Sequence, residues 1–296
     1  MVFGAIVSFF GVHFLHLTAI KLRHENTTFT NISNDIFPQF TPWIDFTIFV
    51  QSSCTTLSYF IIVGQSLPKA FEQMELSPFF TSRTNCVILY WLLVIPLSGF
   101  PKLQEVKITT IISAVTISII ALVIVLYASG SDGILDPCAN LEDDTICDGT
   151  THVDISGYNG LQAMPIILFS FCCQQNAFTI YSELNNPTQW RLDTISAAAM
   201  LTCCLLFVIV SCAGYSTYGD KLEADILEMY PENSLTSACR LMLSFICCAH
   251  FPLQFNPVSF HGFISPVIDC IFLFFYSLFP FSFLHLHFPP SFLASI

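Results

Sequence analysis

The residues with the clearest chemical potential form a short polar run inside an apolar segment. Residues 161–182 are largely apolar but are interrupted by Cys172-Cys173-Gln174-Gln175-Asn176, which carries three amide side chains in a row. Amides in the middle of a membrane are costly unless they face protein, water or a ligand. One interpretation is an interrupted helix, whose unpaired backbone groups and amides bind a zwitterion or an ion. The alternative is that these amides only hydrogen-bond neighbouring helices.

The composition indicates that a membrane-spanning frame positions these amides. Of the 296 residues, 54% are hydrophobic and 10% are charged, whereas a soluble domain carries about 25% charged residues. Residues 108–128 contain no charge, and a helix of that length is roughly 32 Å long, enough for a ~30 Å hydrocarbon core. Several such runs in one chain are hard to reconcile with buried core helices, so the sequence predicts an all-α integral membrane protein.

We expect eight apolar spans, joined by connections rich in proline, glycine and charge. The last span differs in composition from the others and is treated separately below. The expected spans are 1–20, 44–66, 84–100, 107–128, 161–182, 194–217, 236–255 and 267–288.

The distribution of charged residues bears on the binding partners of the protein and on its orientation in the membrane. The net charge of −12 makes nucleic acid an unsuitable partner. Much of the acidity lies in loop 129–160, which also holds Cys138 and Cys147, while the other eleven cysteines lie in or beside apolar spans. If this loop is extracellular, we expect a disulfide between Cys138 and Cys147; the alternative is two free thiols.

A disulfide would place loop 129–160 on the oxidising side of the membrane and residues 185–193 in the cytosol. Lysines and arginines divide five to four between the two sides, which does not decide the orientation. The glycosylation motifs at Asn26 and Asn31 would then be cytosolic and unmodified, and their glycosylation would invert this orientation.

Several segments, in order, resemble one family. The sequence SFCCQQNAFTIYSEL at 170–184 precedes a helix ending in GYSTYGD, and YFIIVGQSLP at 59–68, LVIPLSGFPKL at 93–103 and RLMLSFICCAHFPLQFNP at 240–257 accompany them. Together they resemble the amino acid/auxin permease family, with the greatest similarity to its sodium-coupled neutral amino acid transporters. The resemblance covers about 60–257.

This resemblance implies a fold and a site. The family has eleven helices in a leucine-transporter-type fold with an inverted repeat, and its broken helices one and six hold the substrate and sodium between them. The sixth helix corresponds to 161–182, and Gln174 stands where many relatives carry a titratable histidine. The implied substrate-binding residues are Phe171, Cys172, Cys173, Gln174, Gln175 and Asn176.

The resemblance also implies ion-coupling candidates on helix eight. The hydroxyl position of sodium-coupled relatives falls at Cys248, and a neutral thiol is a poor ligand for a hard cation. Ser244, one turn earlier, is a substitute, and His250 is a candidate for proton coupling; alternatively, His250 is a hydrogen-bonded histidine at the helix end. The coupling ion would be Na⁺ or H⁺, and we expect no other cofactor and no metal site.

The two ends of the sequence suggest an incomplete transporter. Residues 1–20 match the family's second helix, so we expect helix one and the last three helices to be missing. We expect a transporter domain at 1–257 and a divergent tail at 258–296. Residues 271–293 consist mostly of Phe, Leu, Ser and Pro, which is typical of translated intron sequence; the alternative is a true eighth span, although its prolines suit a helix poorly.

The sequence therefore predicts a secondary transporter, working by symport, for small neutral amino acids in the plasma membrane or in a lysosomal or vacuolar membrane. The alternatives are a truncated, inactive or regulatory product of a transporter gene, a channel, or a seven-helix receptor with Asn256-Pro257-Val258-Ser259-Phe260 as its NPxxY-like element. We expect no enzyme and no catalytic residue, because Asp45 is almost the only acid near the interior of a span.

Overall fold

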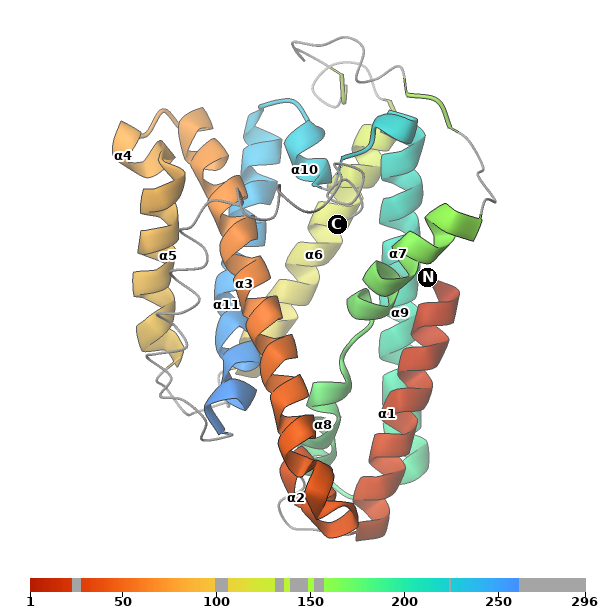
Figure 1. Cartoon of the computed structure of the whole chain (residues 1–296). Helices are drawn as coiled ribbons and strands as arrows, with labels where there is room; N and C mark the ends of the chain where they lie inside the picture. The colour runs from red at the N-terminus through yellow and green to blue at the C-terminus, as the bar shows by residue number, and fades with distance from the viewer. Residues whose placement is uncertain are drawn as a thin grey trace. The chain divides into compact units, whose positions relative to one another are not determined.

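The fold was obtained as a computed structural model (Figure 1). It describes residues 1–22, 28–98, 106–130, 136–138, 149–151, 157–223 and 225–260. The chain divides into two compact units. Unit 1 contains the described residues within 1–48 and 152–212, and unit 2 contains those within 49–151 and 213–260. The helices α3 (Thr41–Gln73) and α9 (Gln189–Tyr218) contribute residues to both units.

Unit 1 is built around the long helix α1 (Val2–Leu22), which packs against the helical pieces that follow residue 156. Its core joins Val12 of α1 to Phe171, Ala177 and Met200. The remaining elements of the unit are α2 (Phe29–Ile36), η1 (Pro38–Phe40), α7 (Gly157–Ser170), η4 (Gln174–Asn176) and α8 (Ala177–Glu183).

Unit 2 packs α11 (Ser234–Phe260) against α5 (Arg83–Ser98) and α6 (Val106–Ala128). Its core is aromatic at the centre, where Phe60 meets Tyr90 and Phe251 in edge-to-face contacts. Shorter elements complete the unit: α4 (Pro78–Thr81), η5 (Gly219–Lys221) and α10 (Ile226–Met229).

Large apolar side chains remain exposed along the long helices. Phe14 on α1, Ile111 on α6 and Leu201 on α9 are each about 60% exposed, which is costly in water but favourable against lipid tails. In the part of the chain that the structure describes, five helices are long and apolar enough to cross a membrane, and α5 contributes a shorter apolar helix. The protein is an all-α, multi-pass integral membrane protein.

Many threonine and serine hydroxyl groups within these helices donate hydrogen bonds to the backbone of the same helix. Thr47, Thr116 and Thr202 each donate a hydrogen bond of 2.8 Å to the carbonyl oxygen four residues earlier. Such bonds satisfy a polar group inside the helix that carries it, so these residues can lie in an apolar span without a polar neighbour.

The predicted spans up to residue 255 are confirmed as helices, but their ends differ. The second span was expected at 44–66, whereas α3 continues through Pro68 to Gln73. The continuation buries Ala70 and pairs Lys69 with Glu228 at 3.0 Å, which offsets the backbone hydrogen bond that a proline cannot donate. The predicted connections also contain short helices, namely α2, α4 and α10. The last expected span, 267–288, lies outside the described residues.

Candidate substrate-binding site

The span at 157–183 is interrupted where the sequence predicts. Helix α7 ends at Ser170 and α8 begins at Ala177, and Figure 1 shows the two as separate pieces joined by an extended stretch. The peptide N–H of Cys172 bonds to the carbonyl of Phe169, and the N–H of Asn176 bonds to that of Cys173, both at 3.0 Å. These three-residue turns replace the regular helical pattern, so some backbone groups near the interruption lose their helical partners.

Helix α1 holds the interruption through side-chain hydrogen bonds. The hydroxyl of Ser8, which is buried, donates to the carbonyl oxygen of Phe171. The hydroxyl oxygen of Ser8 in turn accepts a bond of 3.1 Å from the amide nitrogen of Gln174. Further along, the Nε2 atom of the fully buried His16 donates to the carbonyl of Ala177 at 3.2 Å. Both ends of the interruption are therefore fixed by one neighbouring helix.

The predicted site residues take different positions within the interruption. Phe171 is buried, and its ring packs edge-to-face on Phe207 at 5.3 Å, so its side chain belongs to the core. Gln174 is half-buried, and its Oε1 atom is buried with no hydrogen-bond partner in the described part of the chain. Cys172, Cys173 and Gln175 are half-buried, and Asn176 is exposed. The role of these residues in substrate binding stays a prediction.

The predicted ion-coupling residues lie on α11, in unit 2. Ser244 is buried, and its hydroxyl donates to the carbonyl of Arg240 at 2.9 Å. Cys248 is a half-buried free thiol one turn later, and His250 is half-buried with its Nε2 atom unpartnered among the described residues. Their role in coupling stays a prediction.

The predicted disulfide falls partly outside the described residues. Cys138 is described, and its peptide N–H donates to the carboxylate of Asp136 at 2.9 Å. It is not one of the ten described cysteines with free thiols. Cys147 lies outside the described residues, so the disulfide stays a prediction.

An ionisable pair that the sequence did not predict joins two helices of unit 1. The Nδ1 atom of His13 lies 2.9 Å from Oδ1 of Asp193, and Gln189 donates to the same oxygen at 2.9 Å. The sequence predicts a span that begins only at residue 194, whereas α9 begins at Gln189 and includes Asp193. Histidines inside the first apolar span were the available signal, because ionisable residues within a span are rare and tend to be functional.

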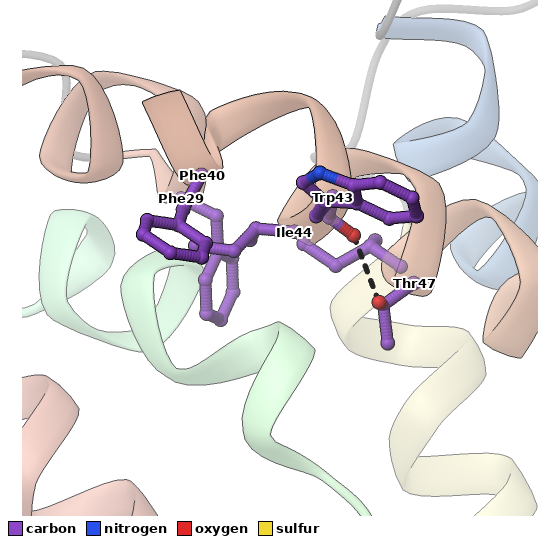
Figure 2. A pocket seen from close by; sticks show the side chains of 6 residues that line it. Phe29, Phe40, Trp43, Ile44 and Thr47 are labelled. Carbon is purple, nitrogen blue, oxygen red and sulfur yellow. Dashed lines mark hydrogen bonds between the residues drawn. The ribbon is translucent and has the colours of Figure 1, made fainter. Parts of the chain in front are cut away.

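A shallow apolar groove of about 250 Å³ lies elsewhere in unit 1 (Figure 2). The hydroxyl of Thr47, its main polar group, donates to the carbonyl of Trp43. With no charged lining residue, the groove offers no ion-pair partner to a zwitterion and suits apolar molecules better. Its lining residues are Phe29, Phe40, Trp43, Ile44, Thr47 and Ile48.

The helices and the interrupted span define a class of protein: a multi-pass helical membrane protein with polar groups at a break within a span. The model of the transmembrane amino acid transporter protein family matches residues 1–261, and the chain belongs to this family. The family match supports the expectation of a transporter rather than an enzyme. It also agrees with the resemblance that the motifs indicated.

Similar proteins include transporters of fungi and mammals. The chain is 25% identical over 259 residues to vacuolar amino acid transporter 5 of Schizosaccharomyces pombe, covering 87% of this chain and 59% of that protein. It is 23% identical over 247 residues to vacuolar amino acid transporter 5 of Saccharomyces cerevisiae, covering 79% and 52%. It is 26% identical over 184 residues to solute carrier family 38 member 8 of Mus musculus, covering 60% and 40%.

The chain thus spans about half the length of these relatives. No solved structure matches it, so the leucine-transporter-type inverted repeat stays a prediction.

Proposed function

We propose that the chain forms part of a secondary transporter for small neutral amino acids, which bind at the interruption between α7 and α8. The observation that carries the proposal is the interruption itself, with the buried and unpartnered Oε1 atom of Gln174. A buried acceptor without a partner costs about 1–3 kcal/mol. An amino acid ammonium group bound there would remove this cost.

The composition of the interruption favours neutral substrates. Residues 171–176 contain no charged side chain, so they offer no ion-pair partner to an acidic or basic substrate. Backbone groups and amides can satisfy the carboxylate and ammonium groups that all amino acids share.

The relatives also bear on the membrane in which the protein would act. Two of the three named above are vacuolar transporters, which favours a vacuolar or lysosomal membrane over the plasma membrane. Transport there would be a physical movement of substrate, driven by the symport of Na⁺ or H⁺.

Exchange of radiolabelled L-alanine by proteoliposomes that contain the full-length protein tests this proposal. We expect saturable exchange that L-serine inhibits and that L-lysine and L-glutamate do not inhibit. Replacing Gln174, Gln175 and Asn176 together by alanine should abolish exchange and leave membrane insertion intact.

The matched control is Gln73→Ala, which removes an amide from the exposed end of α3. It should leave exchange at the wild-type rate. Wild-type exchange by the triple variant would refute the assigned site, and the absence of alanine exchange in the wild type would refute the proposed function.

A further inference from the structure

Three polar side chains meet between α1 and α9 in unit 1. His13 lies in the middle of the apolar span Val2–Leu22, and its Nδ1 atom faces two groups at once. One is the Oδ1 atom of Asp193 at 2.9 Å, and the other is the Nε2 atom of Gln189 at 3.1 Å. Gln189 also donates to Oδ1 of Asp193 at 2.9 Å, so the three groups form a closed triangle.

The short contact between Nδ1 of His13 and Oδ1 of Asp193 requires a proton on one of these two atoms. A carboxylate oxygen and an unprotonated imidazole nitrogen are both acceptors, and two acceptors 2.9 Å apart repel each other. A proton on Nδ1 or on Oδ1 turns this edge into a hydrogen bond. When that proton leaves, the amide nitrogen of Gln189 can donate a hydrogen bond to Nδ1 of His13 or to Oδ1 of Asp193. The protonated and the deprotonated pair therefore both have a hydrogen-bond donor beside them.

We propose that His13, Asp193 and Gln189 form the proton-binding site through which this transporter couples amino acid movement to a proton gradient. This inference rests on the proposed function. It assigns the coupling ion as H⁺ and its binding site to residues of α1 and α9 rather than to residues of α11.

The position of the pair suits a site that exchanges protons. The side chains of His13 and Asp193 are 29% and 21% exposed, so most of each group is shielded by protein but neither is sealed off. An ionisable pair inside apolar helices is costly to maintain. A neutral hydrogen bond would join the two helices at lower cost, which argues against a purely structural role.

Helix α1 links this triangle to the proposed substrate site. Ser8 and His16 of the same helix bond to the carbonyls of Phe171 and Ala177, at the two ends of the interruption. A change in the bonding of His13 to α9 would therefore shift the helix that holds Gln174 in place. Helix α1 would thus connect the proton-binding site to the substrate-binding site, as the coupling of proton and substrate movement requires.

Other titratable groups lie on the elements that pack against α1. The nearest is His16, which interacts electrostatically with both His13 and Asp193. Arg191 of α9 is exposed and donates to the carbonyls of Asn185 and Asn186. The remaining titratable groups on α8, before η4 and on the part of α9 in unit 1 are Cys172, Cys173, Tyr181, Glu183, Cys203, Cys204 and Cys212.

Accumulation of L-alanine in proteoliposomes of the full-length protein under an imposed pH difference tests the inference. A difference of one pH unit should drive about tenfold accumulation if one proton accompanies each alanine. In Asp193→Asn and in His13→Gln, which keep a polar group at each position, accumulation should fall to roughly the onefold level of simple equilibration. Exchange of alanine without a gradient should continue in both variants.

Glu183→Gln is the control, because it removes an exposed carboxylate from α8 without touching the triangle. It should accumulate alanine as the wild type does. Proton-driven accumulation by Asp193→Asn would overturn the inference, and so would loss of exchange together with accumulation, which indicates a structural role. Wild-type accumulation driven by sodium alone would overturn the inference but leave the proposed function standing, whereas absent wild-type exchange would overturn both.

Discussion

Tyr127 of α6 shows how one residue can join two helices within unit 2. Its side chain is fully buried, and its hydroxyl accepts a bond of 2.8 Å from Asn233 and lies 3.2 Å from the hydroxyl of Thr236. Its ring stacks on Tyr230 with the centroids 4.4 Å apart. The hydroxyl and the ring therefore make separate contributions to the packing of α6 against the start of α11.

Removing only the hydroxyl should measure the first contribution. Tyr127→Phe keeps the ring but leaves Asn233 without its acceptor, and we expect the free energy of unfolding to fall by about 1–2 kcal/mol. Denaturation of the purified protein in detergent measures this change. Tyr181→Phe is the control, because the Tyr181 hydroxyl makes no hydrogen bond in the described part of the chain; equal stability of the two variants would contradict the prediction.

Among the elements, α10 is a single turn that depends on its flanking side chains. The carboxylate of Asp225 accepts from the N–H of Leu227 at 3.0 Å, and the buried Arg240 donates to the carbonyl of Leu227 at 3.0 Å. Burial raises the pKa of Asp225 above its ordinary value of 3.8, and the bond from Leu227 and the charges of Arg240 and Lys69 only partly oppose this shift.

The raised pKa gives a definite dependence of stability on pH. The folded chain holds the Asp225 proton at pH values where the unfolded chain has released it. Its stabilising contribution is therefore complete below pH 3.8 and is lost as the pH rises through the folded pKa.

Asp225→Asn should remove this dependence. Asparagine caps a helix as well as aspartate and carries no charge to desolvate. At neutral pH we expect a thermal midpoint equal to or above that of the wild type, and a flatter profile toward acid pH. The exposed Glu232→Gln should keep the wild-type profile. A lower midpoint for Asp225→Asn at neutral pH would mean that the attraction of Arg240 outweighs desolvation.

At the scale of the whole molecule, the orientation of the protein in the membrane can be inferred from the side on which loop 129–160 lies. Exposed cysteines such as Cys203 and Cys212 lie on the apolar helix α9, where lipid protects them from polar reagents. Cys138 lies in the loop. Its predicted bond to Cys147 would fix the loop on the oxidising side of the membrane.

Labelling of intact vesicles with a membrane-impermeant thiol reagent checks this arrangement. With the loop accessible to the reagent, Cys138 and Cys147 should be labelled only after reduction. The double variant Cys138→Ser and Cys147→Ser should show no labelling gain on reduction. Labelling of Cys138 before reduction would contradict the disulfide.

The positions of the spans and of the interruption could be predicted, because both are local properties of the sequence. Apolar runs mark the helices, and the run from Cys172 to Asn176 marks the break. Helix ends were less predictable, since α3 continues past Pro68 and α9 starts within the polar stretch before the apolar run. The ends depend on packing and on partners such as Glu228, which no local pattern contains.

The partners of α1 could not be predicted for a different reason. Ser8, His13 and His16 stand in an apolar run, and nothing in that run indicates which distant residues they contact. Without the pairing, each could be a tolerated polar residue or a functional one. Only the fold brings them to Phe171, Asp193 and Ala177.

This long separation has a consequence for biosynthesis. The partners of Ser8, His13 and His16 follow them by 161 to 180 residues, which takes a ribosome roughly 10 to 35 s to translate. During that interval α1 stays in the membrane with three polar side chains unmatched. Until α7, α8 and α9 have followed, these side chains lack their partners, which makes the release of α1 into lipid less favourable than its apolar residues alone would make it.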